Sequence, residues 1–221
     1  MQPKPIDSHL FISTVMPALE SRDADELARI VKSRWTKDQL CELLTHGSPD
    51  ARKVVCLTLG LVGCKECTTC LVCALQDADP VVNELAEHAL WSIWFRCGKC
   101  CAMSSFKRGL DALEHHDYPQ AVEHLTEATI LDDTFAEAYN QRAIAHYMME
   151  HWCNCLADCR QAVHRVPVHF GAWAGMGHCH AQRGELADAA HCYRQTLSIN
   201  PKMHDIAAAL RKIEQKLHVP A

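Results

Sequence analysis

The sequence is poor in the residues that interrupt helices and has no apolar run long enough to cross a membrane. Nine glycines and nine prolines among 221 residues are few for an all-β protein. No apolar run approaches the roughly 18 to 20 residues of a transmembrane helix. Residues 1–20 place the acidic Asp7 just ahead of a short apolar stretch, unlike a signal peptide. We therefore expect no membrane segment and a cytoplasmic location.

Charge of one sign is also lacking. The net charge of −5 divides evenly, with 11 basic and 13 acidic side chains in residues 1–103 and 11 and 14 in residues 104–221. No basic face emerges, which argues against nucleic acid and anionic lipid as partners. With 48% hydrophobic and 22% charged residues, the composition is that of a folded protein and not of a disordered one.

A spacing of 34 residues repeats from residue 102 to residue 203. Each 34-residue unit has a small residue at position 8, another at position 20 and mostly bulky residues between them. Position 8 holds Gly109, Ala143 and Gly177, and position 20 holds Ala121, Cys155 and Ala189. Small residues let two antiparallel helices approach closely, and bulky ones fill the space between them. Pro167 and Pro201 end the second helix of two units, because proline lacks the N–H that a helix needs.

This pattern resembles the tetratricopeptide repeat. The resemblance implies three helical hairpins at residues 102–135, 136–169 and 170–203. A capping helix is expected at residues 204–218, where Ile206, Leu210, Ile213 and Leu217 share one face. We predict an all-α protein whose helix pairs form an α-solenoid.

A second spacing, of 31 residues, lies upstream. Residues 40–44 align with residues 71–75, and Ser48-Pro49 aligns with Asp79-Pro80. This pattern resembles the short HEAT-like repeats of proteins related to phycobilin lyases, in which proline opens a helix. The resemblance implies HEAT-like repeats at residues 36–98, preceded by an N-terminal segment, residues 1–35, with one helix. A plain pair of helical hairpins is the alternative, and it is equally α-helical.

The tetratricopeptide resemblance also implies where a partner binds. In such arrays the first helix of each unit lines a concave groove, which predicts a peptide or helix with apolar anchors as the ligand. The alternative is that some of these side chains simply pack against neighbouring helices. Carried over to this chain, the predicted groove residues are Phe106, Leu110, Leu113, Asn140, Gln141, Ile144, Tyr147, Met148, His178 and Gln182.

One subset of the family grips the acidic C-terminus of chaperones with lysine, asparagine and arginine side chains. The corresponding positions here hold Phe106, Leu110, Gln141, Gly171 and Gly175, none of which is a cation. We therefore do not expect a chaperone C-terminal tail as the partner.

Cysteine is abundant, with fourteen residues. The spacing Cys64-x-x-Cys67 recurs as Cys97-x-x-Cys100, and two such pairs are what a zinc or iron–sulfur site uses. The alternative is that cysteine serves throughout as a small, reduced packing residue, since many of the fourteen have no metal spacing. We favour packing and predict no cofactor, with these four thiols as the candidates for zinc.

No catalytic signature is present: no HExxH, no phosphate-binding glycine loop and no nucleophile elbow. The prediction is a protein–protein interaction scaffold and not an enzyme. The alternative is a metal-binding sensor that uses the paired cysteines. The identity of the partner does not follow from the sequence.

Overall fold

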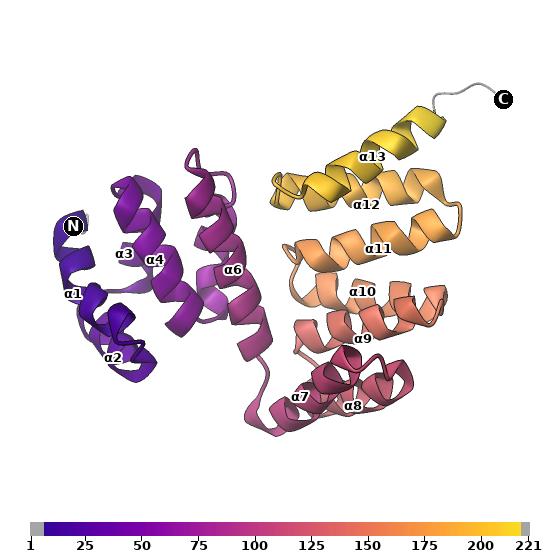
Figure 1. The fold of residues 1–221 in the computed structure, drawn as a ribbon, viewed down its shortest axis with the longest axis horizontal. Helices are drawn as coiled ribbons and strands as arrows, with labels where there is room; N and C mark the ends of the chain where they lie inside the picture. Colours follow the sequence, from indigo (N-terminus) through magenta and orange to yellow (C-terminus); the bar gives the residue numbers. More distant parts are fainter. Residues whose placement is uncertain (1–6, 218–221) are drawn as a thin grey trace. The chain divides into compact units, whose positions relative to one another are not determined.

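The computed structural model describes residues 7–217, which form helices joined by short turns and loops (Figure 1). No strand occurs among these residues, which confirms the all-α prediction. The chain divides into two compact units, residues 1–97 and residues 98–221, and each is described below by itself. None of the helices in the described part of the chain combines the length and apolar character needed to span a bilayer.

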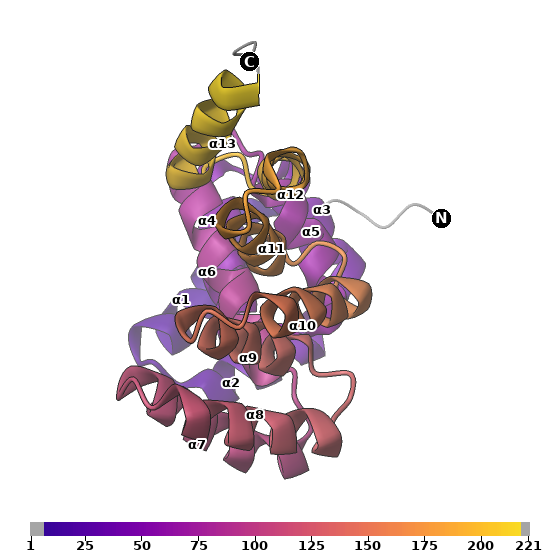
Figure 2. The ribbon, with the colours of Figure 1, turned by 90° about the vertical axis from the view of Figure 1, so that its right-hand side faces the viewer.

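The C-terminal unit consists of three antiparallel helix pairs and a final helix (Figure 1). The two helices of each pair pack against each other, and each pair packs against the next. Figure 2 shows α11 and α12 nearly end-on, lying side by side as one such pair. The bounds are α7 Cys100–Glu114, α8 Tyr118–Leu131, α9 Ala136–Met148, α10 Trp152–Arg165, α11 Phe170–Gln182, α12 Leu186–Ile199 and α13 His204–Leu217.

Glycine sets the separation of the helices in two of the three pairs. A Cβ atom added to Gly109 on α7 would lie 2.5 Å from Leu125 Cγ on α8. One added to Gly177 on α11 would lie 2.4 Å from the ring of Tyr193 on α12. Both distances are too short for real atoms, so the small residue at position 8 is needed for this packing.

The turn inside each helix pair has a residue in the left-handed region at position 15. His116 has φ 60°, Glu150 has φ 61° and Gly184 has φ 76°. Only in the third turn is this residue glycine, which adopts the conformation without steric cost. The turns therefore share one backbone geometry despite their different sequences.

The last helix, α13, covers the end of the array as predicted. Ile206 and Ile213 are buried against the core of the third helix pair, which includes Ala190 and Tyr193. Leu210 packs at the edge of this core, whereas Leu217 is 46% exposed. His218, the last residue of the predicted capping helix, lies outside the described residues.

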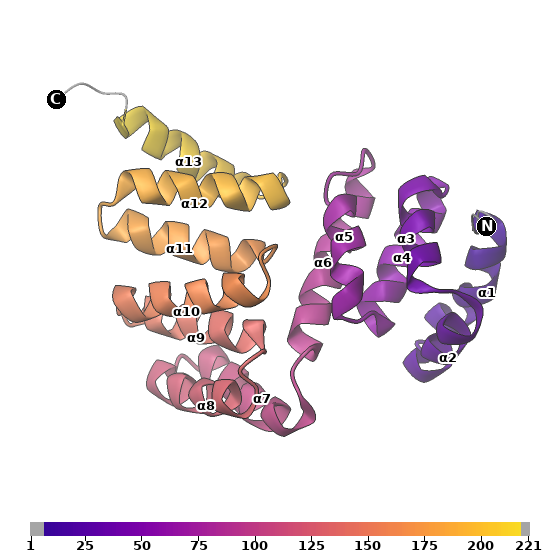
Figure 3. The same ribbon diagram turned by 180° about the vertical axis from the view of Figure 1, so that it is seen from behind.

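The N-terminal unit packs α1, α2, α3, α5 and α6 around α4 and one another (Figure 3). Residues 1–35 contain two helices within the described range, although the sequence predicted one. The additional helix, α1, begins after the Asp7 cap and contains Pro17, a residue that usually interrupts helices. The bounds are α1 Ser8–Glu20, α2 Ala24–Arg34, α3 Lys37–His46, α4 Pro49–Val62, the 3₁₀ turn η1 Lys65–Cys67, α5 Thr68–Ala74 and α6 Pro80–Arg96.

Two residues that are 31 positions apart hold the turns of this unit. Arg52 donates to the carbonyl of Gly47 at 2.8 Å and forms an ion pair with Asp77 at 2.8 Å. Asn83 donates to the carbonyls of Ala74 and Asp77 at 3.1 and 2.9 Å. Each side chain thus fixes the turn that precedes its own helix, α4 or α6.

Candidate functional site

The predicted groove residues lie on α7, α9 and α11, the first helices of the three pairs, which contact each other in succession. The structure places them at different depths. Phe106, Asn140 and Gln141 are buried; Leu110, Leu113 and Tyr147 are half-buried; and Ile144, Met148, His178 and Gln182 are exposed.

The exposed residues and Tyr147 form a continuous patch on α9 and α11. Ile144 is 42% and Met148 51% exposed, and their spacing of four residues places them on adjacent turns of α9. Tyr147 lies next to them in the sequence, and its hydroxyl accepts a hydrogen bond from Gln182 at 3.2 Å. The ring of Tyr147 also lies 6.3 Å from that of His178. We call Ile144, Tyr147, Met148, His178 and Gln182 the inner-face patch.

The polar side chains of the inner-face patch are held in place by their neighbours. The ring of Tyr147 meets that of Trp152 edge-on at 5.2 Å. His178 Nδ1 lies 2.8 Å from the hydroxyl of Tyr193, a residue that is only 2% exposed. A ligand would therefore meet aromatic and polar groups that are already ordered, which reduces the entropy lost on binding.

A buried hydrogen-bond network lies behind the patch and explains why two predicted groove residues do not reach the surface. Glu137 Oε1 accepts from Asn140 at 3.1 Å and from Gln141 at 2.6 Å. Glu137 Oε2 lies 2.9 Å from His169 Nε2, and both side chains are completely buried. His169 Nδ1 accepts from the backbone N–H of Ala172, so Nε2 carries the proton that is donated to Glu137.

This network was not predicted from the sequence. Glu137 and His169 are 32 residues apart. In the other two units, Met103 and Gly171 occupy the position of Glu137, and Phe135 and Met203 occupy that of His169. Nothing in the repeat pattern thus predicts their contact.

A second polar contact fixes α9 against α8 and α10. Arg142 donates to both carboxylate oxygens of Asp158, at 2.8 and 2.6 Å, and to the hydroxyls of Thr126 and Thr129. Burial alone would lower the pKa of Arg142, but the contacts with Asp158 outweigh this effect and raise it. The guanidinium therefore remains charged and connects three helices.

Phe106 belongs to the interior in this structure. It is 1% exposed, and its ring centroid lies 4.5 Å from that of Phe135. The open apolar surface of the unit's first helices is accordingly carried by α9.

The cysteines of the C-terminal unit mostly fill its core. Cys155, Cys159, Cys179 and Cys192 are buried in one cluster with Met176. Burial raises the pKa of Cys192 to about 11, which keeps the thiol protonated at neutral pH. Cys153 is exposed at the start of α10.

The four candidate metal ligands are distributed between the two units. Cys64, Cys67 and Cys97 belong to the N-terminal unit, and Cys100 begins α7 of the C-terminal unit. The sulfur atoms of Cys64 and Cys67 are 3.9 Å apart. Burial, together with the hydrogen bond that the Cys64 thiol donates to the carboxylate of Glu66, raises the pKa of Cys64 to about 11. A metal ion would have to displace this proton.

The family model of the tetratricopeptide repeat matches residues 170–203. The chain is similar to the small glutamine-rich tetratricopeptide repeat-containing protein 2 of Saccharomyces cerevisiae, with 26% identity over 118 residues, 51% of this chain and 34% of that protein. It is 27% identical over 110 residues to mouse sperm-associated antigen 1, covering 50% of this chain and 12% of that protein. The chain thus spans well under two thirds of these relatives.

Solved structures of similar fold include tetratricopeptide domains with bound peptides. The first such domain of Spaghetti (RPAP3), bound to an HSP90 peptide, has a TM-score of 0.53 and 22% identity, and covers 54% of this chain and 94% of that chain. The second domain of human RPAP3, in complex with an HSP70 peptide, has a TM-score of 0.50 and 25% identity, and covers 51% and 94%.

These structures conflict with the expectation that a chaperone tail is not the partner, and we withdraw it. The missing clamp cations remove one way of holding a terminal carboxylate. Apolar and backbone contacts with a peptide do not depend on these cations. Their absence was therefore too narrow a criterion for excluding a chaperone tail. Residues 170–203 thus match the tetratricopeptide repeat model, and the helix pairs of the C-terminal unit have the fold of tetratricopeptide domains.

Proposed function

We propose that the C-terminal unit is a protein-interaction module whose inner-face patch binds a peptide or helix with apolar anchors. The observation that supports this most directly is the exposure of Ile144 and Met148 on adjacent turns of α9. Two neighbouring exposed apolar side chains, bordered by ordered polar groups, offer anchoring contacts and hydrogen bonds to one ligand. The peptide-bound domains of similar fold support the class of ligand.

The test compares patch variants with a matched variant outside the patch. Ile144→Glu and Met148→Glu place a charge in the patch, whereas Ile130→Glu does so at a 76% exposed isoleucine on α8, a second helix of a pair. A peptide-display library selected on the full chain provides the ligand, and fluorescence anisotropy gives its Kd. The HSP90 and HSP70 peptides SRMEEVD and SGPTIEEVD are measured in parallel.

We expect each patch variant to weaken binding at least about tenfold, which corresponds to about 1.4 kcal/mol, and Ile130→Glu to leave it unchanged. Circular dichroism should show unchanged helicity in all three variants. Equal losses in the patch and control variants, or no loss in either, would contradict the proposal.

In the N-terminal unit, we propose that residues 36–98 are two HEAT-like repeats. The matching roles of Arg52 and Asn83, 31 positions apart, support this. We further propose that the chain is non-catalytic and cytoplasmic.

One observation favours metal binding as a second candidate function. With zinc–sulfur bonds of about 2.3 Å, two thiolates of a tetrahedral site lie about 3.8 Å apart. The 3.9 Å between Cys64 and Cys67 is close to this spacing. Elemental analysis of anaerobically purified protein tests it: less than one equivalent of zinc or iron would end this hypothesis, and loss of metal in Cys64→Ser would support it.

A further inference from the structure

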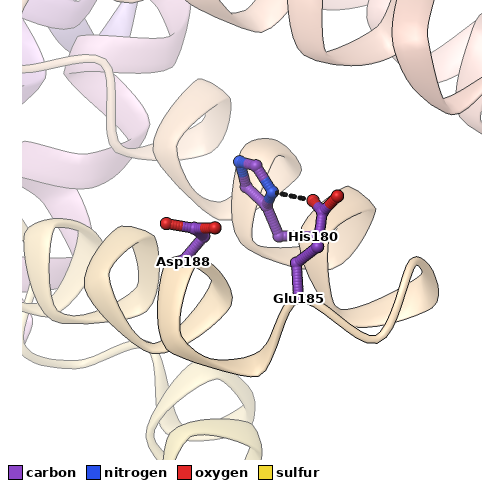
Figure 4. Close-up of side chains that lie close together, drawn as sticks. All are labelled: His180, Glu185 and Asp188. Atoms are coloured by element: carbon purple, nitrogen blue, oxygen red, sulfur yellow. Dashed lines mark hydrogen bonds and ion pairs between the residues drawn. The ribbon is translucent and has the colours of Figure 1, made fainter.

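The turn between α11 and α12 brings three potential metal ligands together outside the inner-face patch. His180 lies near the end of α11, Glu185 holds the N-cap position of α12 and Asp188 belongs to its first turn. One ligand atom of each lies within 4.8 Å of the others. Figure 4 shows the three side chains pointing toward one space, from both sides of the turn.

These side chains line a hollow of about 340 Å³ on the surface. Cys153, Leu156, Arg160 and Arg183 complete its wall. His180 is mostly buried, with 12% of its side chain exposed, while Glu185 is 32% exposed. The hollow is thus open enough for an ion to enter, and the imidazole is fixed in position.

Both carboxylate oxygens of Glu185 already have a partner, so a metal ion would have to displace one of these contacts. Its Oε2 lies 2.6 Å from His180 Nδ1, and its Oε1 accepts from Arg183 at 2.8 Å. An outer partner of this kind commonly orients a carboxylate that binds metal. Arg183 also offsets one negative charge, so the site should hold an ion with moderate affinity.

The other two units show that the fold does not require this arrangement. In the first unit, Asp117 stands where Glu185 stands in the third, and it caps its helix by accepting from the N–H of Gln120. Glu185 makes no side-chain cap hydrogen bond and turns toward α11 instead. The residues at the same three positions are Ala112, Asp117 and Gln120 in the first unit and His146, His151 and Asn154 in the second.

Asp188 has no hydrogen bond or ion pair within residues 7–217, although it lies beside the His180–Glu185 pair. Two carboxylates that lie close together repel each other. A cation bound between them removes this repulsion. Imidazole nitrogen and carboxylate oxygens are together typical ligands of zinc.

We propose that His180, Glu185 and Asp188 form a binding site for a divalent transition metal ion, with zinc as the best match. The ion takes the place of the proton between His180 Nδ1 and Glu185 Oε2, and this proton is released to solvent. At metal–ligand distances of about 2.0 Å, the two ligand atoms of a tetrahedral site lie about 3.3 Å apart, so the pair needs to open by less than 1 Å. Water from the open hollow completes the coordination.

The experiment titrates the full-length, reduced protein with zinc by calorimetry and with cobalt by absorption spectroscopy. The variants Asp188→Asn and His180→Gln each remove one ligand. Asp205→Asn is the matched control, since Asp205 is also an exposed acid in the first turn of a helix, α13. A further variant, Cys64→Ser/Cys67→Ser, separates this site from any thiolate site. Circular dichroism confirms that each variant is folded.

We expect Asp188→Asn and His180→Gln to weaken one zinc-binding event at least about tenfold. Asp205→Asn and the double serine variant should retain that event, and its cobalt spectrum should lack sulfur-to-cobalt charge transfer. The proposal is overturned if no zinc binds, or if zinc affinity is unchanged in both ligand variants. It is also overturned if the event is lost only in the double serine variant.

Discussion

Adding a single methyl group at Gly177 tests how the helix pairs are held together. In Gly177→Ala, the new Cβ would lie 2.4 Å from Cδ1 and Cε1 of Tyr193. The ring has little room to move, because Tyr193 is 2% exposed and its hydroxyl is hydrogen-bonded to His178. Overpacking of this kind costs about 1–3 kcal/mol. Alanine regains about 0.5–1 kcal/mol over glycine inside a helix. We expect a net loss of about 1–2 kcal/mol.

The matched control is Gly175→Ala, in the same helix. There the added Cβ meets only the sulfur of Cys159, at 3.0 Å, and the helical preference for alanine is the same. We therefore expect Gly175→Ala to be close to neutral. Urea unfolding gives the free energies, and hydrogen exchange measured by mass spectrometry assigns the change to α11 and α12.

The second unit suggests a substitution that should compensate for Gly177→Ala. It has Ala143 where the third unit has Gly177, and Cys159 where the third has Tyr193. In a Tyr193→Cys background, Gly177→Ala should thus become neutral or stabilise by up to about 1 kcal/mol. The packing argument fails if Gly177→Ala is as stable as Gly175→Ala, or if its cost persists without the tyrosine ring.

Two further predictions concern the turn residues and the histidines. Gly184→Ala should destabilise the third unit by about 1 kcal/mol, because φ is 76° there and alanine disfavours the left-handed region. Glu150→Gly should not destabilise the second unit, because glycine adopts the φ of 61° without steric cost. The urea midpoints of both variants test this. Burial lowers the pKa of His146 below 6.5, so its neutral form stabilises the fold above pH 6.5 and this contribution is lost as the pH falls below it. His146→Gln should therefore lose less stability than the wild type between pH 7.5 and 5.5. His115, whose pKa is raised by its hydrogen bond to the Asp111 carbonyl, should behave in the opposite sense, and a steeper acid loss in His146→Gln would refute the assignment.

The repeat pattern predicted the C-terminal helices well because it records contacts between residues close in sequence. The small residues at Gly109 and Gly177 face large partners sixteen positions later, so the spacing alone implies the hairpin. The helix α1 was not predicted; it continues through Pro17, a residue type that usually interrupts helices.

The candidate site was predicted only in part, since side-chain depth depends on contacts that the repeat does not specify. Asn140 and Gln141 occupy groove positions by register, yet Glu137 draws both into a buried network. The ligand cluster at His180 was missed because its carboxylates lie across a turn. Glu185, in place of a capping aspartate, was the one signal available.

The middle unit alone presents large apolar side chains on its first helix, and packing does not account for them. In the first and third units, the position that corresponds to Ile144 is occupied by Leu110, which is half-buried, and by His178. The position that corresponds to Met148 is occupied by Glu114 and Gln182 in these two units, and both are polar and exposed. The same fold is thus built with polar residues at these places, so Ile144 and Met148 are not required by the helix pairs. About half of each side chain is left uncovered, so the partner contact that we propose would supply the burial that the helix pairs do not.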